Sequence, residues 1–221
     1  MALRLRKPEG RCGKSVGAAS IILLLGLMWS AAGIAQTAQD SPSAFVRSLG
    51  EEVIAVLQKP DVDRIWRRTQ LRKIFLKSFD TGLIARFALG RYWRTATAEQ
   101  KARYLEIFPE YVADVYAGQF STYSGETFTV FRERRVDEKK SIVNTKIQRP
   151  NGTSYQVDFR VLLGPEGFKN IDVIVEHISL LVTKRDEFSS VIGHEGMDGL
   201  LTRLRQQMEK SHRESVVGQS S

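Results

Sequence analysis

Acidic side chains on predicted strands are the first candidates for acid–base chemistry in this sequence. Asp158, Asp172 and Glu176 lie in segments of alternating hydrophobicity, where two carboxylates facing a cavity could serve as general acid and general base. The alternation, however, places Asp172 and Glu176 on the face opposite Ile171 and Val173. We therefore expect these carboxylates to lie at the surface or in ion pairs rather than to catalyse a reaction.

The sequence gives little support for a metal site, a catalytic thiol or a nucleotide-binding site. The three histidines, His177, His194 and His212, are too far apart in the chain for the short spacing of metal ligands. The single cysteine, Cys12, lies in an N-terminal segment that we expect to be removed. The sequence contains no Gly-x-Ser-x-Gly elbow, phosphate-binding loop or dinucleotide fingerprint. We therefore expect no metal, no cofactor and no catalytic residue, so the protein is not expected to be an enzyme.

Residues 1–35 have the layout of a secretory signal peptide. Residues 4–14 are rich in Lys and Arg, residues 21–29 are mostly apolar, and Gly33 and Ala35 occupy the −3 and −1 positions of a cut before Gln36. An uncleaved membrane anchor is disfavoured because glycine and serine interrupt the apolar run. We expect a periplasmic protein in which residues 36–210 form one domain and residues 211–221 form a flexible tail.

The composition fits one globular domain. Of the 221 residues, 42% are hydrophobic and 26% are charged, which is enough apolar material for a core. The net charge of +8 comes in large part from the leader. We therefore expect no nucleic-acid partner for the mature protein.

Hydrophobic periodicity predicts helices, then strands, then helices again. Helices with a period of about 3.6 residues are expected over residues 41–58, from residue 61, over residues 80–89, from a capping box at residues 97–100, over residues 184–194 and from residue 197. Strands with a period of two are expected over residues 127–135, 141–149 and 155–163, and over a fourth segment around residues 171–175 that continues into the apolar residues 178–182. The expected fold is α+β, with helices packed on a curved antiparallel sheet of about four strands. Periodicity does not distinguish a solid core from an apolar cavity between sheet and helices.

Six segments in this order resemble the periplasmic phospholipid carriers of the MlaC, or toluene-tolerance, family. They are LGRYWR at residues 89–94, FSTYSGE at 120–126, DFRV at 158–161, FKNIDV at 168–173, VEHIS at 175–179 and RDEF at 185–188. The sequence departs from the family pattern at His177, where glycine is usual, and at Phe168, where tryptophan is common. A glycine position suggests a backbone twist that histidine adopts less readily.

The resemblance implies a carrier that holds phospholipid acyl chains between the sheet and the helices, with the head group near solvent. It also implies shuttling between an outer-membrane lipoprotein complex and an inner-membrane ABC transporter with a ring of MCE domains, which maintains outer-membrane lipid asymmetry. Arg160 and Arg185 match family positions, and we expect them to form ion pairs rather than to contact a phosphate or a partner. The residues expected to line the lipid cavity are Phe87, Leu89, Tyr92, Trp93, Phe108, Tyr111, Val112 and Tyr116 on helices, Phe128, Val130, Val157, Phe159, Val161, Val173 and Val175 on strands, and Phe188 at one end.

Alternatives remain at this point. The cargo could be another long-chain or hopanoid-type lipid. A sheet-cavity enzyme would place an acid or a base in the cavity. An adaptor protein would have a solid core and bind no lipid, and in that case the same aromatic residues would simply be core.

Overall fold

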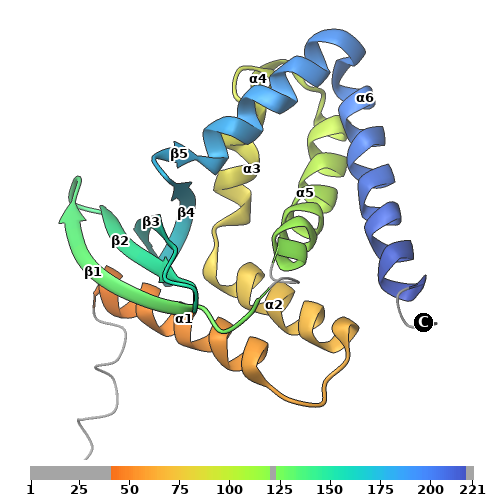
Figure 1. Ribbon diagram of the computed structural model, residues 1–221. Helices are drawn as coiled ribbons and strands as arrows, with labels where there is room; N and C mark the ends of the chain where they lie inside the picture. The colour runs from red at the N-terminus through yellow and green to blue at the C-terminus, as the bar shows by residue number, and fades with distance from the viewer. Residues whose placement is uncertain (1–40, 120–122, 218–221) are drawn as a thin grey trace, which may run out of the picture. The chain divides into compact units, whose positions relative to one another are not determined.

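The computed structural model describes residues 41–119 and 123–217, all within one compact unit, Thr37–Ser221. The expected signal peptide and its cleavage site lie outside the described residues. In the described part the chain forms five helices, then an antiparallel sheet, then a long helix (Figure 1). The fold is therefore α+β, as predicted from the sequence. Among the described residues, no helix is both long enough and apolar enough to cross a bilayer.

The first three helices begin where the sequence supplies capping side chains. α1 (Pro42–Gln58) follows Ser41, whose hydroxyl accepts a hydrogen bond of 3.1 Å from the backbone N–H of Ala44. α2 (Arg64–Ser78) and α3 (Thr81–Leu89) are capped in the same way by Asp63 and Asp80. α2 begins later than residue 61 because the backbone of Asp61 has a positive φ of 54°.

The predicted capping box opens the longest helix of the first half. After the short α4 (Tyr92–Thr95), the hydroxyl of Thr97 accepts a bond of 3.1 Å from the backbone N–H of Gln100. The Gln100 side chain accepts one of 3.1 Å from the backbone N–H of Thr97. α5 (Ala98–Gln119) follows, and its apolar side chains pack against α2, α3 and α6.

The sheet is antiparallel, as expected, and its five strands form a meander. The strands β1 (Thr127–Arg135), β2 (Lys140–Gln148), β3 (Ser154–Gly164), β4 (Gly167–Val175) and β5 (Ile178–Ser179) pair in sequence order, all antiparallel. Irregularities between Val130 and Arg132 and between Arg160 and Val161 shift the register, and such bulges increase the bend and twist of a sheet.

The fourth strand does not continue into residues 178–182. The chain reverses at Glu176 and His177, whose φ angles of 46° and 69° both lie in the left-handed region. Residues 178–179 return as β5, and α6 (Leu180–Val217) begins directly afterwards. An unbroken apolar run is equally compatible with a strand and with a buried helix start, so the sequence alone did not reveal this reversal.

α6 joins the two helices that we expected to be separate. Its backbone is non-helical at Gly196, with φ 73° and ψ 179°, which produces a kink within the element. The helix also runs past residue 211, where we expected a flexible tail to begin. Residues 200–217 contain no glycine or proline, so the sequence has no helix breaker before Gly218.

The buried core is divided into three hydrophobic clusters. The helical cluster joins α3, α5 and α6 around Tyr104, Phe108 and Phe188. The sheet cluster joins α1 to the sheet through Val46, Val143 and Val161. The third cluster lies between α1, α2 and α5 and includes Leu57, Leu71 and Ala117. The sheet and the helical cluster therefore have separate cores.

Candidate functional site

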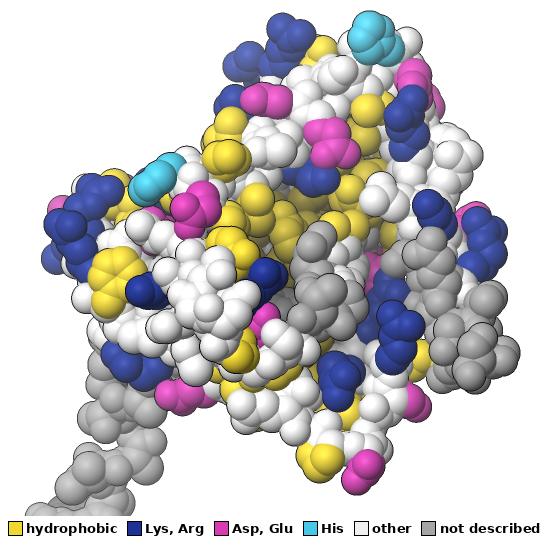
Figure 2. Space-filling view, viewed as in Figure 1, with side chains coloured by type: hydrophobic (Ala, Val, Ile, Leu, Met, Phe, Trp, Pro, Cys, Tyr) yellow, Lys and Arg dark blue, Asp and Glu magenta, His cyan; other side chains and the backbone are white. Residues whose placement is uncertain are grey.

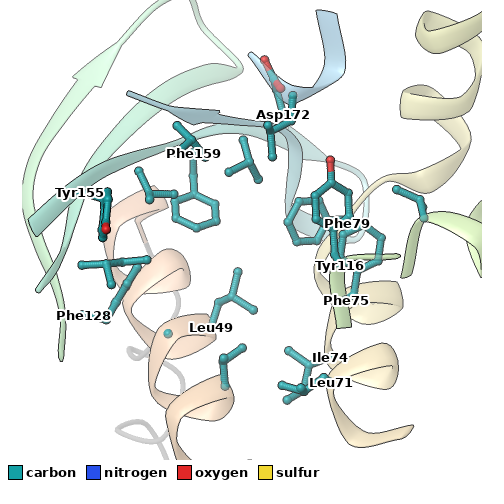
Figure 3. A pocket seen from close by; sticks show the side chains of 18 of the residues that line it. Leu49, Leu71, Ile74, Phe75, Phe79, Tyr116, Phe128, Tyr155, Phe159 and Asp172 are labelled. Atoms are coloured by element: carbon teal, nitrogen blue, oxygen red, sulfur yellow. The ribbon is translucent and has the colours of Figure 1, made fainter. Parts of the chain in front are cut away.

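An apolar pocket of about 530 Å³ is lined by members of all three clusters. Its volume lies within the range of roughly 300 to 1,000 Å³ that is typical of small-molecule sites. In Figure 2 hydrophobic side chains fill a hollow on the face toward the viewer. The close-up in Figure 3 shows Phe128 and Tyr155 on the wall opposite Phe75, Phe79 and Tyr116.

One wall depends on a close approach between α1 and β1. Gly50 is buried on α1, and a Cβ built on it would lie 2.2 Å from a ring carbon of Phe128 on β1. The Phe128 ring in turn packs edge-on against Phe159, with ring centroids 6.2 Å apart. Only glycine allows this approach, so Gly50 places the aromatic pair at the pocket.

The opposite wall is a run of stacked aromatic rings. Phe75 stacks on Phe79 with centroids 4.2 Å apart, and on Tyr116 with centroids 5.7 Å apart. These rings come from the end of α2 and from α5, and all three line the pocket. The two walls together offer a broad apolar surface to an elongated ligand.

Asp172 lines the pocket, contrary to the expected outward orientation. Its side chain is fully buried, and it accepts hydrogen bonds from the hydroxyl of Ser179 at 2.7 Å and from the backbone N–H of Leu181 at 3.1 Å. Arg160 forms an ion pair with it at 3.5 Å. The start of α6 covers this side of β4, which simple alternation along the strand could not reveal. The expected ion pairs of Asp172 and Arg160 are confirmed.

The two other acidic candidates lie near the same end of the sheet. Glu176 accepts a hydrogen bond of 2.6 Å from the backbone N–H of Gln156. The Gln156 side-chain amide donates to both carboxylate oxygens of Asp158, at 3.1 and 3.0 Å. Neither Asp158 nor Glu176 lines the pocket.

Glu126 and Arg149 form a polar group near β1 and β2. Glu126 accepts a bond of 2.8 Å from the backbone N–H of Ser124, and this bond is the main reason that the pKa of Glu126 lies below its ordinary value. Arg149 is 3.5 Å from the Glu126 carboxylate and lies 5.1 Å over the Tyr155 ring. Both charged groups are thus engaged by neighbouring residues.

Lys184 brings a positive charge to the pocket from α6. Its ammonium is 2.6 Å from the Glu187 carboxylate and 3.4 Å from the Tyr111 hydroxyl. Partial burial disfavours the charged form, but Glu187 and Tyr111 outweigh this effect and raise the pKa of Lys184. Lys184 therefore stays protonated at the edge of an apolar pocket.

The structure brings part of the predicted lining set together. The residues of that set that line the pocket are Phe108, Val112, Tyr116, Phe128, Val157, Phe159, Val173 and Val175. On α5 the spacing explains the choice, because Phe108, Val112 and Tyr116 recur every four residues and share one helix face, whereas Tyr111 is off that spacing and does not line the pocket.

The other predicted residues are not among those that line the pocket. Leu89, Tyr111 and Phe188 are buried in the helical cluster, and Tyr92 and Trp93 pack against its outside. Val130 and Val161 belong to the sheet cluster. Phe87 is 42% exposed and lies under the guanidinium of Arg185, which pairs with Asp186 at 3.2 Å. Aromatic character alone does not indicate which side of a helix faces a cavity.

Sequence reasoning missed the contribution of α1, α2 and the start of α6. The lining residues concerned are Leu49, Val53, Ile54, Leu57, Leu71, Ile74, Phe75, Phe79, Leu180 and Leu181. The regular spacing of Leu49, Val53 and Leu57 was available as a signal of an apolar face. That spacing identifies a buried face, but it does not say whether the face meets a core or a cavity. Among residues 41–119 and 123–217, no group of three or more His, Cys, Asp and Glu could hold a metal ion.

Three known proteins resemble this chain in sequence or in fold. The intermembrane phospholipid transport system binding protein MlaC of Haemophilus influenzae is 22% identical over 177 residues, which cover 76% of this chain and 83% of that protein. The toluene tolerance protein ttg2D of Pseudomonas putida is 30% identical over 109 residues, about half of each chain. A solved phospholipid-binding protein from Ralstonia solanacearum, in complex with a phospholipid, shares the fold with a TM-score of 0.67 and 24% identity, and the match covers 77% of this chain and 98% of that one.

The family assignment rests on a match over most of the chain. The model of the family described as MlaC protein matches residues 47–206, which run from α1 into the last part of α6. This range contains both walls of the pocket. The sequence resemblance is therefore confirmed, and the chain belongs to the MlaC family.

Proposed function

We propose that this protein is a periplasmic phospholipid carrier that holds acyl chains in the apolar pocket between the helices and the sheet. The observation that carries the proposal is the pocket itself, about 530 Å³ in volume and lined mainly by aliphatic and aromatic side chains. The names of the relatives support the choice of ligand, because one is a phospholipid transport binding protein and a structural neighbour was solved with a phospholipid bound.

The energetics of such a pocket suit exchange between apolar surroundings. Moving about 30 methylene groups out of water would yield about 24 kcal/mol at about 0.8 kcal/mol each. That exceeds the practical limit of about 18 to 21 kcal/mol for non-covalent affinity, so water is not the relevant reference state. Transfer from a membrane to the pocket exchanges one apolar medium for another. Release into water is prohibitive, while exchange with a membrane is close to neutral.

The proposed route runs between the two membranes of the cell envelope. The protein would be exported by its signal peptide, receive or deliver lipid at an outer-membrane lipoprotein complex, and exchange it with an inner-membrane ABC transporter that carries a ring of MCE domains. This traffic would maintain outer-membrane lipid asymmetry. A carrier alone does not move lipid uphill, so the direction comes from the energised partner.

The first test is the identity of the lipid that copurifies with the protein. The protein is purified from the periplasm without detergent, and its organic extract is analysed by mass spectrometry. A diacyl phospholipid at about one molecule or more per protein is expected. A hopanoid or another long-chain lipid in its place would redefine the cargo, and protein free of lipid would contradict the carrier function.

Delivery is tested separately with reconstituted membranes. Protein loaded with labelled phospholipid is mixed with liposomes that contain the ABC transporter and its MCE ring. Loss of label from the protein is expected to be faster than with protein-free liposomes of the same lipid composition. Equal rates would contradict the proposed partner while leaving lipid binding intact.

An enzyme on this scaffold would need a free acid or base in the pocket. The lining is not entirely apolar, because it includes the carboxylates of Glu126 and Asp172. Asp172 is held by Ser179, Leu181 and Arg160, and Glu126 by Ser124 and Arg149. These contacts favour structural roles for both carboxylates, which supports a carrier over an enzyme.

A further inference from the structure

The wall formed by α5 and α6 carries two polar groups in the same part of the pocket. Tyr116 and Lys184 both line it, and the positive charge of Lys184 acts on the Tyr116 hydroxyl. Among the described residues the Tyr116 hydroxyl has no hydrogen-bond partner, and Figure 3 shows it on the same side of the pocket as Asp172. A hydroxyl on the pocket wall without a protein partner is free to donate a hydrogen bond to a ligand.

Lys184 is arranged so that it can accept a second anion. Its side chain is only 20% exposed, whereas that of its partner Glu187 is 48% exposed. An exposed carboxylate loses little free energy when it leaves an ion pair and turns toward water, so a ligand oxygen can replace Glu187 as the partner of Lys184. Tyr111 still supports the ammonium from the helical cluster, through its hydroxyl at 3.4 Å.

The neighbouring acid does not cancel this positive charge. The buried carboxylate of Asp172 is compensated by Arg160 and by two hydrogen bonds from Ser179 and Leu181. Glu187 is half-exposed and screened by water. Lys184 therefore provides a localised positive charge on the pocket wall that also carries Tyr116, where α5 packs against α6.

Lys184 lies apart both from Arg149 and from the apolar lining of α1 and α2. Arg149, another basic residue of the lining, follows β2, whereas Lys184 is on α6 beyond β4. β2 and β4 are two strand spacings apart, or about 10 Å. The lining from α1 and α2 is aliphatic and aromatic and includes Leu49, Leu71 and Ile74.

We propose that Lys184 and Tyr116 bind the phosphate of the bound phospholipid, so that its acyl chains extend along α1, α2 and β1. Lys184 donates a charge-assisted hydrogen bond to a phosphate oxygen, and the Tyr116 hydroxyl donates another to the phosphate or to an ester carbonyl. This inference rests on the proposed carrier function and adds the orientation of the cargo and a preference for phosphate-bearing lipids over neutral ones.

The test is a competition between two lipids with the same acyl chains. Delipidated protein is incubated with vesicles that contain equal amounts of dipalmitoylphosphatidylglycerol and dipalmitoylglycerol, and the lipid retained by the protein is quantified by mass spectrometry. Lys184→Met is expected to lower the ratio of phospholipid to diacylglycerol about tenfold, which is the effect of losing one charge-assisted bond. The total lipid per protein should stay the same, since the acyl-chain surface is unchanged.

Three further variants define the origin of the effect. Lys184→Arg keeps the charge and should keep the preference. Tyr116→Phe removes only a hydroxyl and should lower the ratio about threefold, which also serves if Lys184→Met folds poorly. Arg185→Gln removes the adjacent positive charge, which lies over Phe87 and outside the lining, and should leave the ratio unchanged.

The outcomes separate this inference from the carrier function. An unchanged ratio in both Lys184→Met and Tyr116→Phe, with lipid still bound, would overturn the phosphate site alone. Loss of the preference in Arg149→Gln but not in Lys184→Met would place the phosphate across the sheet and overturn the proposed orientation. Failure of the wild-type protein to retain either lipid would overturn the carrier function, and with it the site.

Discussion

His177 adopts a backbone conformation that side-chain-bearing residues rarely adopt. Its φ is 69°, and the preceding Glu176 has a φ of 46°. The turn is held at Glu176, whose backbone N–H donates to the carbonyl of Gln156 at 3.0 Å and whose carboxylate accepts from the Gln156 N–H at 2.6 Å. The resemblance to a family with glycine at this position suggested a twist here, and the twist is present although the residue is histidine. Left-handed backbone costs a residue with a Cβ about 1 to 2 kcal/mol.

Replacing His177 by glycine should therefore stabilise the fold. We expect His177→Gly to raise the free energy of unfolding by about 1 kcal/mol, because the strain at the turn is relieved. Urea denaturation of the two proteins measures the difference. Ile178→Gly is the matched control, since residue 178 is in β5, where glycine should lower stability. A His177→Gly protein that is no more stable than the wild type would show that other contacts offset the strain.

At the scale of elements, the packing of α1 on β1 sets the width of the pocket. Gly50→Ala should destabilise the protein by about 1 to 3 kcal/mol through overpacking, although alanine is the better helix former by about 1 kcal/mol. The added methyl group would push the Phe128 ring, which lies 2.2 Å from its position, toward the pocket. The melting temperature in thermal denaturation and the amount of lipid retained should both decrease.

A second glycine in a helix provides the control for this effect. A Cβ built on Gly118 of α5 meets nothing within 4 Å among the described residues. Gly118→Ala should therefore stabilise the protein by about 0.5 to 1 kcal/mol, through helix propensity alone. Equal shifts in the two variants would contradict the close approach of α1 to β1.

The pocket face of β3 can be tested by placing a charge on it. Phe159→Asp should abolish lipid retention or unfold the domain, because a carboxylate without a partner would face the apolar lining. Val173→Asp on the neighbouring strand should do the same, since the two residues are register partners. Leu163→Asp on β3 is the control, because Leu163 is 44% exposed. A folded Phe159→Asp protein that still retains lipid would refute the assignment of this face.

Hydrophobic periodicity predicted the positions of helices and strands better than it predicted which elements pack against each other. The helix starts expected near residues 41, 80 and 97 are confirmed, because the caps at Ser41, Asp80 and Thr97 are local interactions. The inward orientation of Phe159 and Val173 also followed from alternation. The burial of Asp172 did not follow, because it depends on the chain reversal that brings the start of α6 back over β4. The pocket residues of α1 and α2 were missed for a similar reason, since the spacing of apolar residues on a helix does not indicate what that face packs against.

For the whole molecule, buried tyrosines predict sensitivity to alkali. The hydroxyl of fully buried Tyr104 donates a bond of 3.1 Å to the carbonyl of Ala85. Burial raises the pKa of Tyr104 well above its ordinary value of 10.0, and it also raises the pKa values of Tyr111 and Tyr116. The unfolded chain therefore loses these protons at a lower pH than the folded one. Their contribution is fully present below pH 10.0 and is lost as the pH rises toward the folded pKa values.

Alkaline denaturation followed by circular dichroism measures this effect. Ionisation of these tyrosines should not change the free energy of unfolding below about pH 10, and the free energy of unfolding should fall as the pH rises above it. Tyr104→Phe should reduce the steepness of the decline, at a cost of about 1 kcal/mol at neutral pH from the lost hydrogen bond. An unchanged slope in Tyr104→Phe would mean that its phenol does not resist ionisation in the folded state.

The division of the core into three clusters has a consequence for the life cycle of a carrier. Residues from all three clusters meet at the pocket, so a lipid bound there would act as a shared piece of core and tie the sheet to the helices. By mass action, a ligand at 100 times its dissociation constant adds about 2.7 kcal/mol to stability. Unloaded molecules would then unfold and be digested by proteases sooner than loaded ones. Proteolysis would then remove unloaded protein selectively, and the lifetime of the protein would increase with the supply of lipid.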